Sequence, residues 1–188
     1  DNQVLSISTE TKSENEKEPV ENVRKFVRSF PKDSFKSITI EYSEKNKGLA
    51  SSIITGVTKI VNTYGKIIVV EDDLVTNSFF LEFMNNALDF YENRKKVFHI
   101  GGWAYPINFS SDKPFLWRTM NCWGWATWSD RWSYFEKDSQ KLIDQFKPKM
   151  IKQFNLNGAE PFWQQVIENH EERINTWAIF WYASIFIN

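Results

Sequence analysis

Residues 66–74 read Lys66-Ile67-Ile68-Val69-Val70-Glu71-Asp72-Asp73-Leu74, an apolar β-branched run followed directly by three carboxylates. An unbroken Ile/Val run is typical of a strand that is buried on both faces of a sheet. In open α/β sheets, ligands bind where parallel strands end, so acids at that point indicate a ligand site. Adjacent carboxylates repel one another, and a divalent cation relieves that repulsion. The segment therefore predicts a buried parallel strand with a metal site at its end.

The bulk composition indicates one domain with a sizeable core and no global charge. The chain has 188 residues, and 23 basic residues nearly balance 24 acidic ones, which gives a net charge of −1. This balance argues against a nucleic-acid partner, which would need a basic surface. Aromatic residues make up 16% of the chain and include nine Trp. Such an excess fits an aromatic-rich core, and it also favours a carbohydrate or nucleotide ligand.

Cysteine usage and hydropathy bear on the compartment. The single cysteine, Cys122, can form neither an internal disulfide nor a Cys-based zinc site, and this suits a reducing compartment. No stretch approaches the roughly 18–20 apolar residues of a membrane span, and no signal peptide is visible. We therefore expect a cytoplasmic protein without a transmembrane segment, either free or bound peripherally at the inner face of the membrane.

The predicted elements alternate between strands and helices. Strands are expected at 4–8, 37–42, 67–70 and 97–101, and helices at 20–29, 49–64 and 77–93. This βαβ order is typical of a parallel, doubly wound sheet. From residue 103 the chain is crowded with Trp, Gly and Pro, which is typical of binding loops. Helices near 139–146 and 162–172 and an apolar segment at 176–187 complete the chain.

Two segments around the acids resemble a known enzyme family. The chain reads Asn46-Lys47-Gly48-Leu49-Ala50-Ser51-Ser52-Ile53, then a predicted helix, then residues 68–74. This order is similar to the donor-binding half of GT-A nucleotide-sugar glycosyltransferases. It is most similar to bacterial sugar transferases related to N-acetylglucosaminyltransferase I, whose Asp-x-Asp motif is written Glu-Asp-Asp. The stretches 123–132 and 175–179 also resemble these proteins.

The resemblance implies an α/β fold of the GT-A, Rossmann-like kind, with a mainly parallel sheet flanked by helices. Residues 1–102 would form the nucleotide-sugar donor subdomain, and residues 103–188 a Trp-rich acceptor and lid subdomain. Relatives begin with a further strand and helix and continue beyond the last motif, so we expect a chain truncated at both ends. A sheet without its first strand has an unpaired edge, which favours homo-oligomers.

The activity that the resemblance implies is transfer of a sugar from a nucleotide diphosphate sugar, preferably a UDP-sugar, to an acceptor hydroxyl. The reaction would invert the anomeric centre and serve bacterial glycan synthesis. In the family the last acid, here Asp73, coordinates Mn²⁺ (Mg²⁺ is the alternative) that is held by the diphosphate. Asp72 and Glu71 would face the sugar and the ribose. The metal would neutralise charge on the departing diphosphate.

An inverting transfer needs a general base for the acceptor hydroxyl. The resembled eukaryotic enzyme has two aspartates after a Phe-Trp pair, but this chain has Gln164 and Gln165. Glutamine accepts no proton at neutral pH, so Glu160 is the first candidate. Asp130 is the second, although its neighbour Arg131 indicates an ion pair instead.

Further substrate contacts are expected on the nucleotide and sugar sides, at Glu10, Asn46, Lys47, Gly102, Trp103, Trp123 and Trp125. Residues such as Asn46 and Lys47 also simply start helices, and Gly102 could serve either close approach to a sugar or tight packing. The segment 123–128 could close over the diphosphate as a lid or pack as a hairpin. Of the two histidines, His99 is expected in the core and His170 on a solvated helix face.

Two other function classes compete with this assignment. A catalytically silent carbohydrate-binding module would use the Trp-rich surface, bind sugar without metal and tolerate Asp73→Ala. A metal-dependent phosphotransferase or nucleotidyltransferase would also place carboxylates at strand ends, but it would be expected to carry a Gly-rich phosphate loop, which this sequence lacks.

Overall fold

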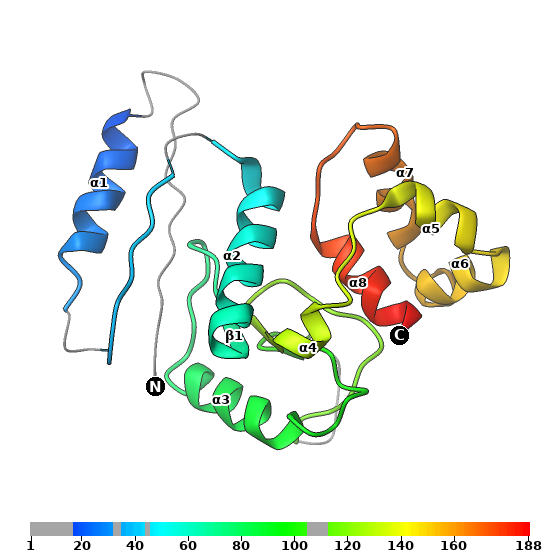
Figure 1. The fold of residues 1–188 in the computed structure, drawn as a ribbon. Coiled ribbons are helices and arrows are strands. Elements are labelled where there is room, and N and C mark those ends of the chain that lie inside the picture. Colours follow the sequence, from blue (N-terminus) through cyan, green and yellow to red (C-terminus); the bar gives the residue numbers. More distant parts are fainter. Residues whose placement is uncertain (1–16, 32–34, 44–45, 105–112) are drawn as a thin grey trace. The chain divides into compact units, whose positions relative to one another are not determined.

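The computed structural model describes residues 17–31, 35–43, 46–104 and 113–188 (Figure 1). The chain divides into two units, residues 1–56 and 57–188, and the division falls inside helix α2 (Gly48–Tyr64). The helix expected at 49–64 is thereby confirmed.

The first unit contains helix α1 (Lys17–Arg28), whose acidic first turn and basic last turn complement the helix dipole. Arg28 donates hydrogen bonds to Glu21 Oε1 (3.0 Å) and to Tyr42 Oη (3.1 Å). Tyr42 belongs to residues 37–43, which form no strand, so the prediction of a strand at 37–42 is wrong. The strand expected at 4–8 lies outside the described residues.

The second unit contains a three-stranded sheet in the order β1-β3-β2, made of β1 (Lys66–Val69), β2 (Ile100–Gly101) and β3 (Trp125–Trp128). Strand β3 is antiparallel to both neighbours: Val69 of β1 and Gly101 of β2 both lie opposite Trp125. The predicted mainly parallel, Rossmann-like sheet is therefore wrong. The reason is that β3, from the segment expected to be a loop, lies between the two strands whose parallel pairing the βαβ pattern predicts.

The central strand of this sheet is β3, all of whose residues are buried. Ala126 and Trp128 pack on one face, and Trp125 and Thr127 lie on the other because side chains alternate along a strand. Thr127 Oγ1 donates to Phe98 O at 2.8 Å. Strand β1 pairs on one side only within the described residues, and most of it is half-buried. The strand buried on both faces is thus β3 rather than the Ile/Val run.

Helix α3 (Phe80–Tyr91) follows β1 in the chain and covers one face of the sheet. Its apolar side chains and those of the strands form one cluster: Phe80, Met84, Ala87, Leu88, Ile100, Ala126 and Trp128. The short helix α4 (Ser129–Trp132) begins directly after β3. Trp132 Nε1 donates to Thr58 Oγ1 of α2 at 2.9 Å, which ties α4 to the C-terminal half of α2.

The rest of the chain is helical and has its own core. The elements are α5 (Ser139–Gln145), α6 (Pro148–Phe154), the 3₁₀ turn η3 (Leu156–Gly158), α7 (Phe162–His170) and α8 (Ala178–Ile187). The helices expected near 139–146 and 162–172 are confirmed, whereas α6 has only seven residues and shows too little periodicity to predict. Within the described ranges, no helix has both the length and the hydropathy needed to cross a membrane.

Candidate active site

Three segments meet at one edge of the sheet. Since β1 and β2 both run antiparallel to β3, both end where β3 begins. The acid turn, which we define as Glu71, Asp72 and Asp73, follows the end of β1. Gly102 and Trp103 follow β2, and Cys122, Trp123 and Gly124 precede β3. This edge therefore gathers half of the site residues that the sequence predicts.

Direct contacts join two of these segments. Gly102 N donates to Gly124 O at 2.7 Å, and the Trp103 and Trp123 rings meet edge to face with centroids 4.5 Å apart. Asn121 holds the pair together: its Nδ2 donates to Trp103 O at 2.7 Å, and its Oδ1 accepts from Trp123 N at 3.3 Å. Trp123 remains 49% exposed, so part of its ring is open to a ligand.

The acid turn lies close to Cys122. Partial burial raises the pKa of Glu71, and the charges of Asp73 and Asp72 raise it further. Burial likewise raises the pKa of the Cys122 thiol, and the nearby charges of Glu71 and Asp73 add to that shift. The charge contributions to both shifts indicate that negative charge gathers at this edge. The acid turn and the segment before β3 therefore lie within electrostatic reach of each other.

The acid turn offers oxygen ligands of the type that hard divalent cations prefer. Asp72 and Asp73 are exposed, offer oxygen ligands and lie in a negative field that a cation would relieve. No group of three or more His, Cys, Asp or Glu in the part of the chain described here is arranged to hold a metal alone. Mg²⁺-type sites commonly use only one or two carboxylates and complete their coordination with phosphate oxygens and water.

Gly102 and Gly124 are required by packing against α3. A Cβ on Gly102 would lie 2.4 Å from Phe80 Cε2, 2.7 Å from Met84 Cε and 3.0 Å from Gly124 O. Gly124 has a φ of +67°, and a Cβ there would lie 2.8 Å from Phe80 Cε2. This geometry supports the tight-packing alternative for Gly102.

We expect Gly102→Ala to lower the free energy of unfolding by about 1–3 kcal/mol, because Phe80 and Met84 must move to admit the new methyl group. Urea denaturation followed by circular dichroism measures this loss. Gly56→Ala is the matched control, since a Cβ at Gly56 in α2 meets nothing within 4 Å. An equal loss in both variants would contradict the packing argument.

Trp125 lies beneath this edge rather than on it. It has no exposed surface and packs between His99, with ring centroids 5.4 Å apart, and Trp177, at 5.2 Å. Trp177 comes from the stretch 175–179, so that motif supports the core here. Trp181 Nε1 donates to His99 Nδ1 at 3.2 Å, and His99 is thus in the core as expected.

Asp130 lies at the opposite edge of the sheet, because α4 follows the C-terminal end of β3. It forms ion pairs with Lys95 (2.7 Å) and Arg131 (2.8 Å), as the sequence indicated for Arg131. Burial by itself would raise the pKa of Asp130, but the hydrogen bonds from Lys95 and Arg131 outweigh it and lower that pKa. A carboxylate held in its charged form in this way is a weak proton acceptor.

The other predicted residues lie elsewhere or are not described. Glu160 is in the turn between η3 and α7, where its N donates to Asn155 O at 3.2 Å. Asn46 Oδ1 accepts from Gly48 N at 2.8 Å, so Asn46 starts α2, and Lys47 beside it is exposed. Both belong to the first unit. Glu10 lies outside the described residues.

Sequence reasoning missed two residues of this edge. Cys122 drew attention only as a lone thiol, although it directly precedes the Trp-Gly-Trp stretch. Asn121 carries no pattern that predicts its two hydrogen bonds to the Trp pair. Comparison of the chain with protein-family models, with curated proteins and with solved structures gave no match.

Proposed function

We propose that this sheet edge is the donor site of a metal-dependent glycosyltransferase, which transfers a sugar from a nucleotide diphosphate sugar to an acceptor hydroxyl. One observation carries the proposal: the acid turn and the Trp103–Trp123 pair share one edge, with Cys122 in the electrostatic reach of both Glu71 and Asp73. Such a donor presents a diphosphate, which needs a cation, and a sugar, whose apolar face stacks on an aromatic ring.

Each residue at this edge would have a distinct task. Asp73, aided by Asp72, would hold a divalent ion together with the diphosphate oxygens. When bound, that ion would neutralise the charge that develops on the leaving diphosphate. The half-buried Glu71 would accept hydrogen bonds from sugar or ribose hydroxyls. The exposed part of Trp123 would stack on the sugar, with Asn121 fixing the orientation of its segment.

Glu160 stays our candidate for the general base. Asp130 is a poorer one, since Lys95 and Arg131 hold its charged form. We place the reaction in bacterial glycan synthesis with a UDP-sugar donor and a glycan acceptor, on the cytoplasmic side. Self-association through the outer edge of β1 is a further part of this proposal.

The test is calorimetric titration of the protein with UDP, with and without Mn²⁺. We expect UDP binding to depend on Mn²⁺. Loss of a residue that only supports a metal ligand typically weakens metal binding by about 10–100-fold, so Asp73→Asn, which removes a proposed ligand itself, should weaken UDP binding at least as much. Asp144→Asn, which removes an exposed carboxylate on α5, is the control and should bind like the wild type. The proposal would be refuted if UDP bound tightly and its affinity changed neither on removal of Mn²⁺ nor in Asp73→Asn. Transfer assays with several UDP-sugars would then identify the donor.

The second candidate is a carbohydrate-binding module without catalysis, favoured by the exposed ring of Trp123. It predicts sugar binding that needs no metal, survives Asp73→Asn and is lost in Trp123→Ala. The same titrations, repeated with free monosaccharides, separate the two candidates.

A further inference from the structure

The segment Lys113–Arg118 presents three consecutive apolar side chains to solvent. Phe115, Leu116 and Trp117 are 38%, 70% and 57% exposed. The Phe115 and Trp117 rings meet edge to face with centroids 6.1 Å apart, which makes one apolar tip. Single exposed apolar residues are ordinary, but a contiguous group of large ones marks an interaction surface.

Cations surround this apolar tip. Lys113 and Arg118 bracket it, and residues 113–129 contain no acid, while Asp112 directly precedes Lys113. A second basic segment is α6, where Lys149 and Lys152 are exposed, preceded by Lys147, and residues 145–159 contain no acid. Because the whole chain has a net charge of −1, this excess of positive charge is local.

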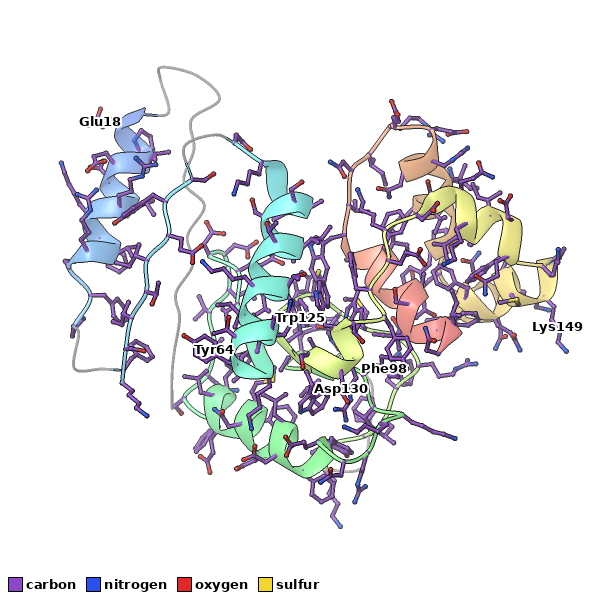
Figure 2. The ribbon with its side chains drawn as sticks, viewed as in Figure 1. Glu18, Tyr64, Phe98, Trp125, Asp130 and Lys149 are labelled. Carbon is purple, nitrogen blue, oxygen red and sulfur yellow. The ribbon has the colours of Figure 1, made fainter. Side chains whose placement is uncertain are left out.

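The segment Lys113–Arg118 lies near the last residue of α6. Met120, just after Arg118, packs against the helical cluster that contains Phe154, the last residue of α6. Tyr182 Oη donates to Phe154 O at 2.9 Å. Burial raises the pKa of Tyr182, and Arg118 is close enough for its charge to oppose that shift. Figure 2 shows Lys149 on the outer side of α6.

We propose that Lys113–Arg118, together with Lys149 and Lys152 of α6 and Lys147 before it, docks on an anionic phospholipid bilayer. Trp and other amphipathic rings settle at the level of the headgroups, where an apolar tip finds acyl chains and the cations find phosphates. Lys and Arg near an anionic surface each add to binding. An apolar tip beside several cations suits an anionic membrane, which can use both at once.

Docking there would bring the candidate active site to the membrane. The segment lies in the connection between Trp103 after β2 and Trp123 before β3, so it emerges from the edge that carries the acid turn. A membrane-borne acceptor would then be presented to the donor site. Only this last step rests on the proposed function, since the docking itself requires no catalysis.

Co-sedimentation with phosphatidylcholine vesicles, with and without phosphatidylglycerol, tests the docking of the full chain. We expect binding to the anionic vesicles only, weakened by salt. The double variant Leu116→Ser/Trp117→Ser should lower the partition coefficient by at least about tenfold, because it removes large apolar side chains from the interface. Lys149→Gln/Lys152→Gln should lower it by about fivefold per charge.

Matched controls keep the result specific. Phe79, the residue before α3, is 70% exposed, as Leu116 is. Phe79→Ser therefore removes an equally exposed apolar side chain from a different part of the surface. Lys25→Gln/Lys36→Gln removes two exposed charges from the first unit. Circular dichroism verifies that each variant is folded. Absence of wild-type binding, or an equal loss in the controls, would overturn the proposal. So would light scattering that shows a dimer which Leu116→Ser dissociates, since the surface would then bind a second copy.

Discussion

Lowering the pH from 7 to 4 is expected to reduce the free energy of unfolding by about 3 kcal/mol through His99 alone. Burial lowers the pKa of His99 from 6.5 to about 3, and the nearby Asn121 backbone opposes this only in part. Below pH 6.5 the unfolded chain takes up a proton that the folded chain rejects. The contribution is therefore complete above that pH and is lost as the pH falls toward 3.

Urea unfolding at steps between pH 7 and pH 4 measures this loss. His99→Gln cannot take up the proton and should flatten the pH dependence by about 1.4 kcal/mol per pH unit. His170→Gln is the matched control, because His170 ends α7 and is exposed. The same slope in the wild type and in His99→Gln would contradict the account of a neutral, buried imidazole.

Arg131 is a buried cation that completes the C-terminal end of α3. Its Nη2 donates to Tyr91 O at 3.1 Å and to Glu92 O at 2.6 Å, and its Nη1 donates to Asp130 Oδ1 at 2.8 Å. The guanidinium carbon lies 4.2 Å from the centre of the Trp128 ring. The last carbonyls of a helix have no partner within it and carry partial negative charge, so a cation is well placed here.

We expect Arg131→Met to cost about 2–3 kcal/mol of unfolding free energy, since two carbonyls at the end of α3 would lose a charged donor. Arg131→Lys should retain only part of this free energy. The ammonium group of Lys lacks the planar, forked arrangement of N–H donors with which the guanidinium reaches three acceptors at once. Urea denaturation gives the totals, and hydrogen exchange should show lost protection in the last turn of α3.

Arg173→Met is the control for Arg131. Arg173 is exposed and pairs with Glu168 and Glu171 at the surface, so its loss should cost no more than about 1 kcal/mol. An equal loss of unfolding free energy in Arg131→Met and Arg173→Met would show that the hydrogen bonds from Arg131 to the end of α3 add no stability beyond that of a surface ion pair.

The sequence predicts helices of this chain better than its sheet. Helix α2 follows from apolar residues at helical spacing, and β1 from its Ile/Val run. A local run specifies a strand but not its partner, so nothing in residues 66–74 reveals that Val69 pairs with Trp125 in the antiparallel sense. Strand β3 escaped prediction because Gly and Trp crowd its segment, and its burial on both faces removes the polar alternation that usually marks a strand.

For the site, the sequence correctly places the acids directly after a strand, because charge following an apolar run is visible in one dimension. The contact between Trp103 and Trp123 depends on the pairing of β3 with β2. That pairing joins residues far apart in the sequence, so no local pattern predicts it. The burial of Trp125 has the same origin: alternation along β3 turns it toward Trp177 and His99. The roles assigned to these residues remain predictions.

The central claim is that the acid turn and the Trp103–Trp123 pair face one ligand. It is tested most directly by the indole N–H signals of these two tryptophans in the presence of UDP and Mn²⁺, since the paramagnetic ion broadens only nearby resonances. We predict that the Trp123 and Trp103 signals broaden and that Asp73→Asn restores them. Sharp signals under conditions in which UDP and Mn²⁺ bind, or equal broadening in Asp73→Asn, would contradict the claim.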